Sequence, residues 1–572
     1  MQNNQDKEQS RNMILFFAIT MLIMLIYPHV FGPDQSAVSR EQIQTHMVEN
    51  AEIRANSQIL KQDDDIEEEV TPIETIRIDA QRISGTISTK GLQFNDVILK
   101  DYTTKYDSTE KVSVFGDSKY FAMTSWKSSN KNVKLPDQNS CWKTNGTLLT
   151  PSTPIILTWD NQQGLLFSKI IKVDENFVFT ITDTVKNYGE TSVDLKNSAE
   201  IYRELPDQES DSMGFYNGPI GYFEKSLKEV EYADIEKKQN IEYSSQGGWF
   251  GITDKYWLVS FVPEANSNYK VNYKFAPNNN KKCYIIESEH NSIQLEPSMQ
   301  VSKTQHLFVG AKEIQNLDMY EEKLNVPHFD LVIDFGKLYI LTKPLLYAVS
   351  YTKDLVGNMG LGILLITLLL KLLLFPLANK SYRSMNRMKD IQPKLQELQR
   401  KYANDQARLG QAVSELYKKE DVSPMGGCLP MFLQWPILFA LYKVLYISIE
   451  MRQAPFFGWI HDLSIADPWS VLTLGGLIPV TLPGFLQIGI WPLIMGLSMW
   501  IQQKMGPAPA DPAQGKVMLI MPVMFTFMFA QLPSGLVIYW TFSNILAILQ
   551  QYLIQRIDEK DRAKKLKKVE TK

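Results

Sequence analysis

A long apolar run with one charge inside it strongly constrains how this chain folds. Between Asp354 and Lys380 the only charged residue is Lys371. A stretch of this length and composition is long enough to span a bilayer. A lysine in such a span costs about 2.5–3.5 kcal/mol on insertion scales unless it reaches water or a partner. Two interpretations fit its position: the ammonium reaches the nearer membrane surface along its aliphatic stem, or it lies in a polar cavity within the membrane.

The N-terminus predicts another membrane segment. Residues 12–33 carry no charge, and Met13–Phe31 is almost wholly apolar, longer than the apolar core of a signal peptide. No Ala-x-Ala cleavage site follows, so residues 1–33 are interpreted as an uncleaved anchor in preference to a signal peptide. Residues 34–75 are polar and contain an acidic run, which predicts a flexible linker and, as the alternative, an acidic docking segment.

Residues 76–333 have the pattern of β-strands. Apolar and polar side chains alternate in several short segments separated by turn-forming residues, among them Ile76–Asp79, Ile83–Ser88, Phe177–Thr182 and Tyr269–Phe275. Alternation with period two predicts an antiparallel β-sandwich. Because no paired acid and base stands out in it, we predict no catalytic residue. Residues 334–356, which mix leucines with Lys337 and Lys343, predict an amphipathic helix at the membrane surface.

The rest of the chain predicts a membrane core over residues 357–555. Its predicted spans are residues 358–378, 429–449, 491–505, 517–530 and 534–552. Residues 469–490 are apolar but broken by Gly476, Pro479, Pro483 and Gly484, and we interpret them as a re-entrant or interfacial segment in preference to a full span. The predicted fold class is therefore a polytopic α-helical membrane protein with six spans and one large β-sandwich domain.

The charges of the chain are divided unequally, and this predicts its orientation. Residues 34–340 hold 32 lysines and arginines against 46 aspartates and glutamates, whereas residues 341–572 hold 25 against 15. Residues 379–428 are basic and predict a helical hairpin broken near Ala403–Asp405, and residues 556–572 form a basic tail. The positive-inside rule then places both termini in the cytoplasm and residues 34–356 outside it. The basic segments are thus evidence for topology, and no nucleic-acid substrate is predicted.

Cysteine and histidine are too scarce to predict a metal site or cofactor. The chain has three cysteines, Cys141, Cys283 and Cys428, and six histidines, without metal-ligand spacing. Cys141 and Cys283 lie in the segment predicted to be exported, where a disulfide between them is one alternative and two free thiols the other.

Several motifs occur in a fixed order in the C-terminal region. They are Pro327–Asp330, Asp334–Gly336, Gly357–Gly360, Phe375–Leu377, Gln392–Lys394, Leu416–Lys418, Pro424–Pro430, Gln434–Pro436, Glu450–Phe456, Trp459–Leu463, Asp467–Pro468 and Pro533–Tyr539. In this order the chain resembles the YidC membrane-protein insertases, closely over residues 325–556 and in architecture over residues 76–325. The resemblance implies a periplasmic supersandwich, a core of five helices in the inner membrane, and no enzymatic activity.

The resemblance also implies site residues and partners. Lys371 takes the position of a groove cation that many relatives fill with arginine, and Thr367 shares its helix face. The remaining expected groove residues are Gln434, Trp435, Pro436, Met528 and Trp540, of which Trp435 and Met528 are equally explained by packing. The implied partners are nascent membrane proteins, the Sec translocon, membrane lipid, and the ribosome and targeting factors, the last two bound through residues 379–428 and the basic tail.

Two other functions fit parts of this pattern. A secondary transporter would also hold an intramembrane lysine, but it usually has internal repeats, and none is found in the sequence. A membrane-anchored enzyme acting on sugars would explain the large sandwich, but it needs an acid and a base in one cleft.

Overall fold

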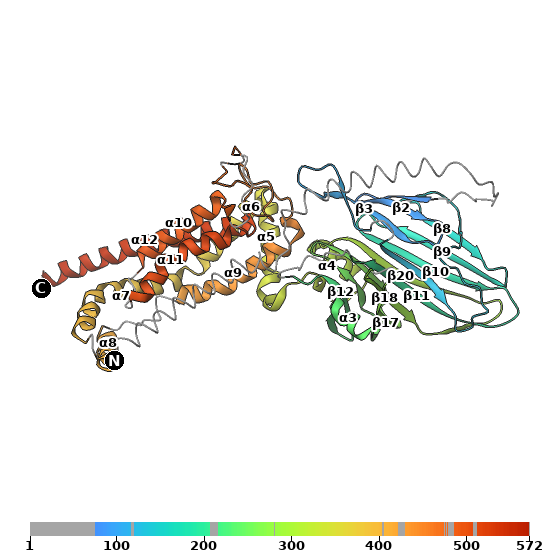
Figure 1. Cartoon of the computed structure of the whole chain (residues 1–572), viewed down its shortest axis with the longest axis horizontal. Helices are drawn as coiled ribbons and strands as arrows, with labels where there is room; N and C mark the ends of the chain where they lie inside the picture. Colours follow the sequence, from blue (N-terminus) through green and yellow to red (C-terminus); the bar gives the residue numbers. More distant parts are fainter. Residues whose placement is uncertain are drawn as a thin grey trace. The chain divides into compact units, whose positions relative to one another are not determined.

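The computed structural model describes residues 75–115, 119–205, 215–278, 281–402, 405–420, 429–473, 475, 477–478, 486–506 and 512–570. The described residues divide between Asp334 and Phe335 into a β-rich unit and a helical unit (Figure 1). The predicted anchor, residues 1–33, and the predicted linker, residues 34–75, lie outside the described residues, apart from Thr75 at the start of the first strand.

The first of two large sheets in the β-rich unit has the strand order β14-β17-β18-β11-β5-β3-β2-β1-β7, with β19 paired to β11 and β4 paired to β3. Its strands are β1 (Thr75–Asp79), β2 (Ile83–Ser88), β3 (Phe94–Thr103), β4 (Lys111–Ser113), β5 (Tyr120–Lys127), β7 (Leu148–Leu149), β11 (Val193–Glu204), β14 (Asn240–Gln246), β17 (Asn268–Phe275), β18 (Cys283–His290) and β19 (Ile293–Leu295). Its pairings are antiparallel except for the parallel pair of β1 and β7.

The second sheet has the order β13-β12-β15-β16-β20-β10-β9-β8-β6 and is antiparallel throughout. Its strands are β6 (Lys143–Thr144), β8 (Ile155–Asp160), β9 (Leu165–Val173), β10 (Val178–Asn187), β12 (Gly218–Phe223), β13 (Ser226–Glu229), β15 (Trp249–Thr253), β16 (Trp257–Pro263) and β20 (Gln300–Ala311). The described part of this unit also contains the short helices α3 (Tyr232–Lys238), α4 (Ile314–Lys323) and the 3-10 helix η1 (Phe329–Val332).

The alternating sequence pattern produces the core between the two sheets. In β9, for example, every second residue from Leu165 to Val173 is buried, because successive side chains point to opposite faces of a strand. Phe94 of the first sheet contacts Phe179 of the second, with ring centroids 5.0 Å apart. The two sheets therefore pack face to face, as the pattern predicted.

A buried ion pair interrupts this apolar core. Lys169 Nζ lies 2.6 Å from Asp183 Oδ1, and the two side chains are 4% and 2% exposed. The ammonium also donates to the carbonyl of Thr124 on the opposite sheet at 2.9 Å. The pair therefore links the two sheets by a polar contact.

The two cysteines of this unit are both free thiols, exposed at Cys141 and buried at Cys283.

The second unit is helical. Its elements are η2 (Gly336–Leu338), α5 (Tyr339–Val356), α6 (Met359–Leu373), α7 (Phe375–Lys401), α8 (Gln406–Lys419), α9 (Leu429–Ile447), η4 (Ile449–Met451), α10 (Ile490–Met505), α11 (Pro512–Phe529) and α12 (Ser534–Glu570). An apolar cluster with residues of α6, α9, α10 and α12 forms its core, including Ile363, Leu441, Met495 and Val537.

Local sequence explains how α5 and α6 are separated. Gly357 ends α5 with φ +71°, a left-handed conformation that glycine adopts without steric cost. Asn358 then caps α6, because its side-chain oxygen accepts a hydrogen bond from the amide of Leu361 at 3.1 Å. As a result the chain bends by 118° between the two helices, and the amphipathic segment expected at residues 334–356 is a helix distinct from α6.

The expected helical hairpin is present as α7 and α8. Lys394 Nζ on α7 lies 2.6 Å from Glu420 Oε1 just beyond α8, while residues 403–404 between the helices are outside the described part. The first helix starts earlier than residue 379: α6 ends at Leu373 with Leu374 as its C-cap, and α7 begins at Phe375. Pro376 lies in the first turn of α7, a position that tolerates proline.

Membrane-crossing length is clear for one described helix. Ser534–Lys560, within α12, is long and apolar enough to span by itself, and α5 with α6 passes the same test only as a bent pair. Trp435–Ile447 and Gly515–Phe529 are shorter apolar helices. Helices α6, α9, α10, α11 and α12 overlap the five spans expected in the core, and the total of six crossings stays a prediction.

The segment expected to be re-entrant, residues 469–490, is described only in part. The amide of Val471 donates to the carbonyl of Ile488 at 3.0 Å, and Ser470 forms an antiparallel bridge with Gly489. The two ends of the segment therefore lie side by side.

Candidate functional site

A pocket opens among helices α6, α7, α9 and α12 in the helical unit. Its volume is about 50 Å³, and because about 10–15 Å³ on this measure holds one water, it has room for a few water molecules. Its lining consists of Thr367, Leu370, Lys371, Leu374, Leu377, Ala378, Tyr382, Ile437, Tyr539, Ser543 and Gln550. Two of the residues expected from the sequence, Lys371 and Thr367, are thus brought together here.

Lys371 lies in the last turn of α6, which ends at Leu373. The terminal carbonyl groups of a helix carry partial negative charge, so a cation in the last turn is stabilised by the helix dipole. One turn earlier, Thr367 is 2% exposed and its hydroxyl donates to the carbonyl of Ile363 at 2.6 Å. The lysine itself is half-buried. The cation is therefore placed at the end of an apolar helix and in the lining of the pocket.

Three polar residues of α12 face the same pocket and were missed in the sequence. Tyr539, Ser543 and Gln550 follow one another at intervals of four and seven residues, which puts them on one helix face. Gln550 Nε2 donates to the backbone carbonyl of Lys371 at 3.3 Å. Polar residues at helical spacing inside an apolar segment are the signal that would have identified them.

Two further hydrogen bonds fix α12 against α10. Asn544 Nδ2 donates to Ser498 Oγ at 3.1 Å, and Gln551 Nε2 donates to the carbonyl of Met505 at 2.7 Å. Asn544 and Gln551 are 4% and 1% exposed. Because a buried amide costs free energy unless it is hydrogen-bonded, these contacts hold α12 in the rotation that directs its polar face to the pocket.

The other expected groove residues do not line this pocket. Trp435 and Pro436 on α9 are exposed, with Trp435 at 49% and in edge contact with Phe439, whereas their neighbour Ile437 does line the pocket. The side chain of Gln434 is outside the described part.

Met528 and Trp540 pack against the apolar core of the helical unit. The ring centroids of Trp540 and Phe529 lie 4.7 Å apart in an edge-to-face arrangement. Packing therefore accounts for the positions of both side chains.

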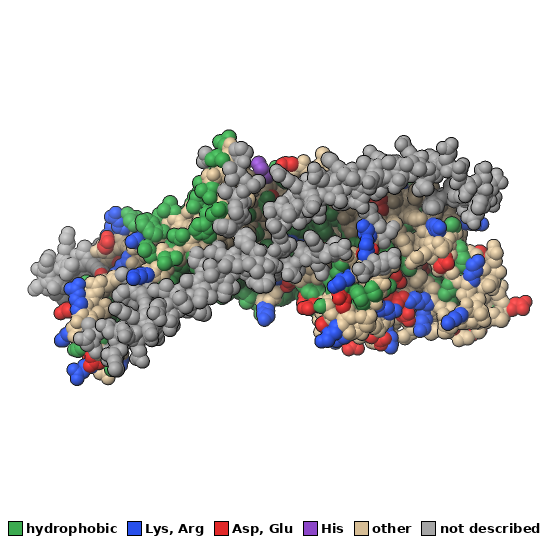
Figure 2. Space-filling model, viewed as in Figure 1, with side chains coloured by type: hydrophobic (Ala, Val, Ile, Leu, Met, Phe, Trp, Pro, Cys, Tyr) green, Lys and Arg blue, Asp and Glu red, His purple; other side chains and the backbone are tan. Residues whose placement is uncertain are grey.

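Apolar side chains gather on the face of the helical unit that Figure 2 shows, and many of them are exposed. Exposed large residues include Leu369, Leu372 and Leu373 on α6, Leu497 and Trp500 on α10, Leu519 and Ile520 on α11, and Leu549 and Leu553 on α12. A surface of this extent is typical of a contact with lipid or with another protein.

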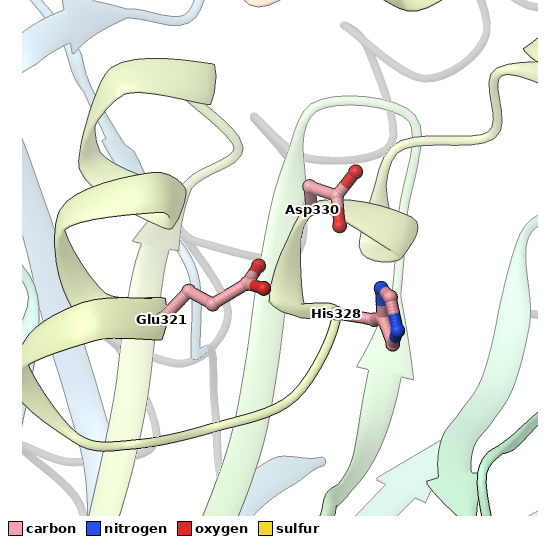
Figure 3. Close-up of side chains that lie close together, drawn as sticks. All are labelled: Glu321, His328 and Asp330. Carbon is pink, nitrogen blue, oxygen red and sulfur yellow. The ribbon is translucent and has the colours of Figure 1, made fainter. Parts of the chain in front are cut away.

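A second group of potential ligands lies in the β-rich unit (Figure 3). Glu321 of α4, His328 and Asp330 present one ligand atom each within 4.8 Å of one another. Glu321 Oε2 accepts a hydrogen bond from the amide of Phe329 at 3.1 Å. This carboxylate therefore stabilises the turn between α4 and η1, and we assign no ligand to the group.

Comparison with known families identifies the class. The family model described as the 60Kd inner membrane protein matches residues 351–562, and the model of the YidC periplasmic domain matches residues 75–348. The chain is thus an inner-membrane protein with a periplasmic domain. Its class is that of the membrane protein insertases, which are not enzymes. The chain belongs to the YidC family of membrane protein insertases, which insert nascent proteins into the membrane.

Curated relatives are similar in sequence to this chain over most of its length. The membrane protein insertase YidC of Rickettsia bellii is 41% identical over 96% of this chain and 99% of its own, and that of Rickettsia massiliae is 42% identical over 86% and 89%. Among solved structures, an active YidC insertase with its first transmembrane domain resolved matches with a TM-score of 0.35 and 17% identity, covering 84% of this chain and 94% of that one.

Proposed function

We propose that the pocket around Lys371 is the part of the insertase that receives the polar flank of a substrate. A nascent segment would place its short polar or acidic flank at the pocket while its apolar part moves into lipid along α9 and its neighbours. The observation that carries this proposal is a cation at the end of the apolar helix α6, in one pocket with the polar groups of Thr367, Ser543 and Gln550.

Energetics support a mechanism without a nucleotide. Moving about 20 apolar residues into lipid is favourable by itself, so the barrier is the polar flank. A fixed positive charge and adjacent polar groups would stabilise an acidic flank during its passage. The membrane potential would add about 2.3 kcal/mol per charge per 100 mV.

The test is insertion of a single-span reporter with an acidic flank into vesicles that contain the purified protein. We expect Lys371→Ala to slow insertion about tenfold and Lys371→Glu to slow it more. Lys504→Ala is the matched control, because Lys504 is also a lysine in the last turn of an apolar helix but does not line the pocket, and this variant should insert normally. Insertion at the wild-type rate by Lys371→Ala would remove the charge from the mechanism.

The topology proposed for this function has both termini in the cytoplasm, residues 34–356 in the periplasm, and six crossings formed by residues 1–33 and helices α6, α9, α10, α11 and α12. The unequal charge of the two halves of the chain supports it. Labelling of single cysteines from either side of sealed vesicles would test it, and residues on α8 and in the sandwich should react from opposite sides.

We propose further that the α7–α8 hairpin and the basic C-terminal segment bind the ribosome and targeting factors, and that the protein acts alone or with the Sec translocon. Residues 379–428 hold ten lysines and arginines against six aspartates and glutamates, and a basic surface attracts ribosomal RNA phosphates at low salt. Co-sedimentation with ribosomes across a salt series should show binding that weakens as salt rises.

A further inference from the structure

Beyond the pocket, a carboxylate of α12 contacts two side chains of α7. Asn386 Nδ2 on α7 donates to Asp558 Oδ2 on α12 at 3.0 Å, and Arg383 Nε lies 3.5 Å from Asp558 Oδ1. The side chain of Asp558 is 14% exposed and Asn386 is 8% exposed. We call these three residues the Asp558 contact.

The Asp558 contact continues the helix faces that line the pocket. On α7, Asn386 follows the lining residue Tyr382 by one turn, and on α12, Asp558 follows the lining residue Gln550 by two. Between them Ile554 is 1% exposed. Because residues four apart lie on the same helix face, the contact and one wall of the pocket belong to the same α7–α12 interface.

The pocket is too small for its proposed occupant while this interface is closed. A volume of about 50 Å³ admits a few waters but no turn of peptide. Its walls are Thr367 and Lys371 on α6, Tyr382 on α7 and Gln550 on α12, and Gln550 is hydrogen-bonded to α6. Movement of α7 away from α12 would widen it without disturbing that bond.

We propose that the Asp558 contact controls access to the pocket: while it is made, α7 lies against α12 and no substrate flank enters, and insertion requires it to open. A hydrogen bond to a charged group contributes more than a neutral one, and a carboxylate that loses its partners while still buried is destabilised. Opening is therefore coupled to hydration of Asp558. This inference rests on the proposed function, in which the pocket receives the flank.

A reversible cross-link across the interface tests the proposal. In full-length protein with Cys141, Cys283 and Cys428 replaced by serine, Asn386→Cys and Asp558→Cys are joined by a short reducible cross-linker. We expect reporter insertion into vesicles to fall at least tenfold and to recover within twofold after reduction. The matched control joins Ser498→Cys to Asn544→Cys, which also ties α12 to a neighbour but leaves α7 free, and its cross-linked form should insert the reporter within twofold of its own reduced form.

Insertion by the cross-linked Asn386→Cys/Asp558→Cys protein at the rate of its reduced form would overturn the proposal. A second measurement is independent of activity: spin labels at the exposed positions Glu397 on α7 and Lys560 on α12 report the distance between the helices. Asp558→Asn should shift that distribution to longer distances, and an unchanged distribution would also overturn the proposal.

The cross-linking experiment and the Lys371→Ala variant together separate this proposal from the one on which it rests. Normal insertion by Lys371→Ala together with a block by the cross-link would reject the role of the charge but keep the control by the Asp558 contact. Loss of insertion in Lys371→Ala together with free insertion by the cross-linked protein would keep the role of the charge but reject the control by the Asp558 contact.

Discussion

Gln550 of α12 donates a hydrogen bond to the backbone carbonyl of Lys371 at 3.3 Å. The bond joins α12 to α6, the helix that carries Lys371, 179 residues earlier in the chain. The last four carbonyl groups of an α-helix have no hydrogen-bond partner within the helix, and Lys371 lies in the last turn of α6. The side-chain amide of Gln550 therefore supplies a hydrogen bond to a backbone carbonyl in an apolar region. The positions of the lysine and of the polar face of α12 are therefore linked.

The chemistry of the cation gives the first prediction. If Lys371 acts as a point charge, Lys371→Arg should insert an acidic-flank reporter within about threefold of the wild-type rate, although arginine binds carboxylates bidentately. Lys371→Met keeps the length without the charge and should slow this reporter about tenfold, or about 1.4 kcal/mol. Initial rates in vesicles measure both. A neutral-flank reporter is the control, and equal slowing of both reporters by Lys371→Met would show that the charge itself is not used.

The ion pair in the sandwich gives the second prediction. Asp183→Ala leaves the ammonium of Lys169 buried without its partner, which typically costs about 3–5 kcal/mol, and it should lower the unfolding midpoint of the sandwich in the full-length protein. The double variant Lys169→Met/Asp183→Leu should recover most of that loss, because well-packed apolar residues replace a buried pair at little cost. Glu242→Ala breaks the exposed pair with Lys270 and should leave the midpoint unchanged. Tryptophan fluorescence during urea unfolding measures all three.

Two histidines in the sandwich predict how its stability depends on pH. Burial lowers the pKa of His290 and of His306 below the ordinary value of 6.5. The unfolded chain then binds more protons than the folded one as the pH falls below about 6.5, so this contribution to stability is complete above that pH and decreases below it. The melting temperature should fall between pH 7.5 and 5.5, and less steeply in His290→Gln/His306→Gln. Identical slopes would assign the pH dependence to other groups.

The loop before α10 gives the fourth prediction. Asp467 Oδ1 accepts from Trp459 Nε1 at 2.9 Å, and Oδ2 accepts from the amide of Trp491 in the first turn of α10 at 3.0 Å. Since hydrogen bonds to a charged group contribute about 1.5–3 kcal/mol, Asp467→Ala should destabilise the helical unit by a similar amount in thermal unfolding in detergent.

A glycine beside this carboxylate provides a second variant and a control. A Cβ at Gly489 would lie 2.5 Å from Asp467 Oδ2, whereas one at Gly515 would contact nothing within 4 Å. Gly489→Ala should therefore destabilise the helical unit as Asp467→Ala does, and Gly515→Ala should not. Unchanged melting of Gly489→Ala would reject the role given to Asp467.

Local patterns in the sequence predicted some of the elements. Alternation over Ile83–Ser88 predicted β2 with its observed bounds, and the basic segment with a break near Ala403–Asp405 predicted the α7–α8 hairpin. The patterns predicted the ends of helices less reliably. The predicted span ran to residue 378, whereas α6 ends at Leu373. The reason is that Pro376 and the cap geometry, which act over two or three residues, decide where one helix gives way to the next.

The sequence by itself determined that Lys371 is the one charge between Asp354 and Lys380 and that it shares a helix face with Thr367, because both follow from spacing within one short segment. It also determined the division into a β-rich and a helical unit, because the period of the apolar residues differs between the two parts. Only the tertiary structure decided which distant residues meet that lysine. Tyr382, Ser543 and Gln550 reach the pocket, whereas Met528 and Trp540 pack into the core and Trp435 points outward. Periodicity fixes which side chains share a helix face, but the rotation of one helix against another is set by contacts such as Asn544 with Ser498, which join residues far apart in the chain.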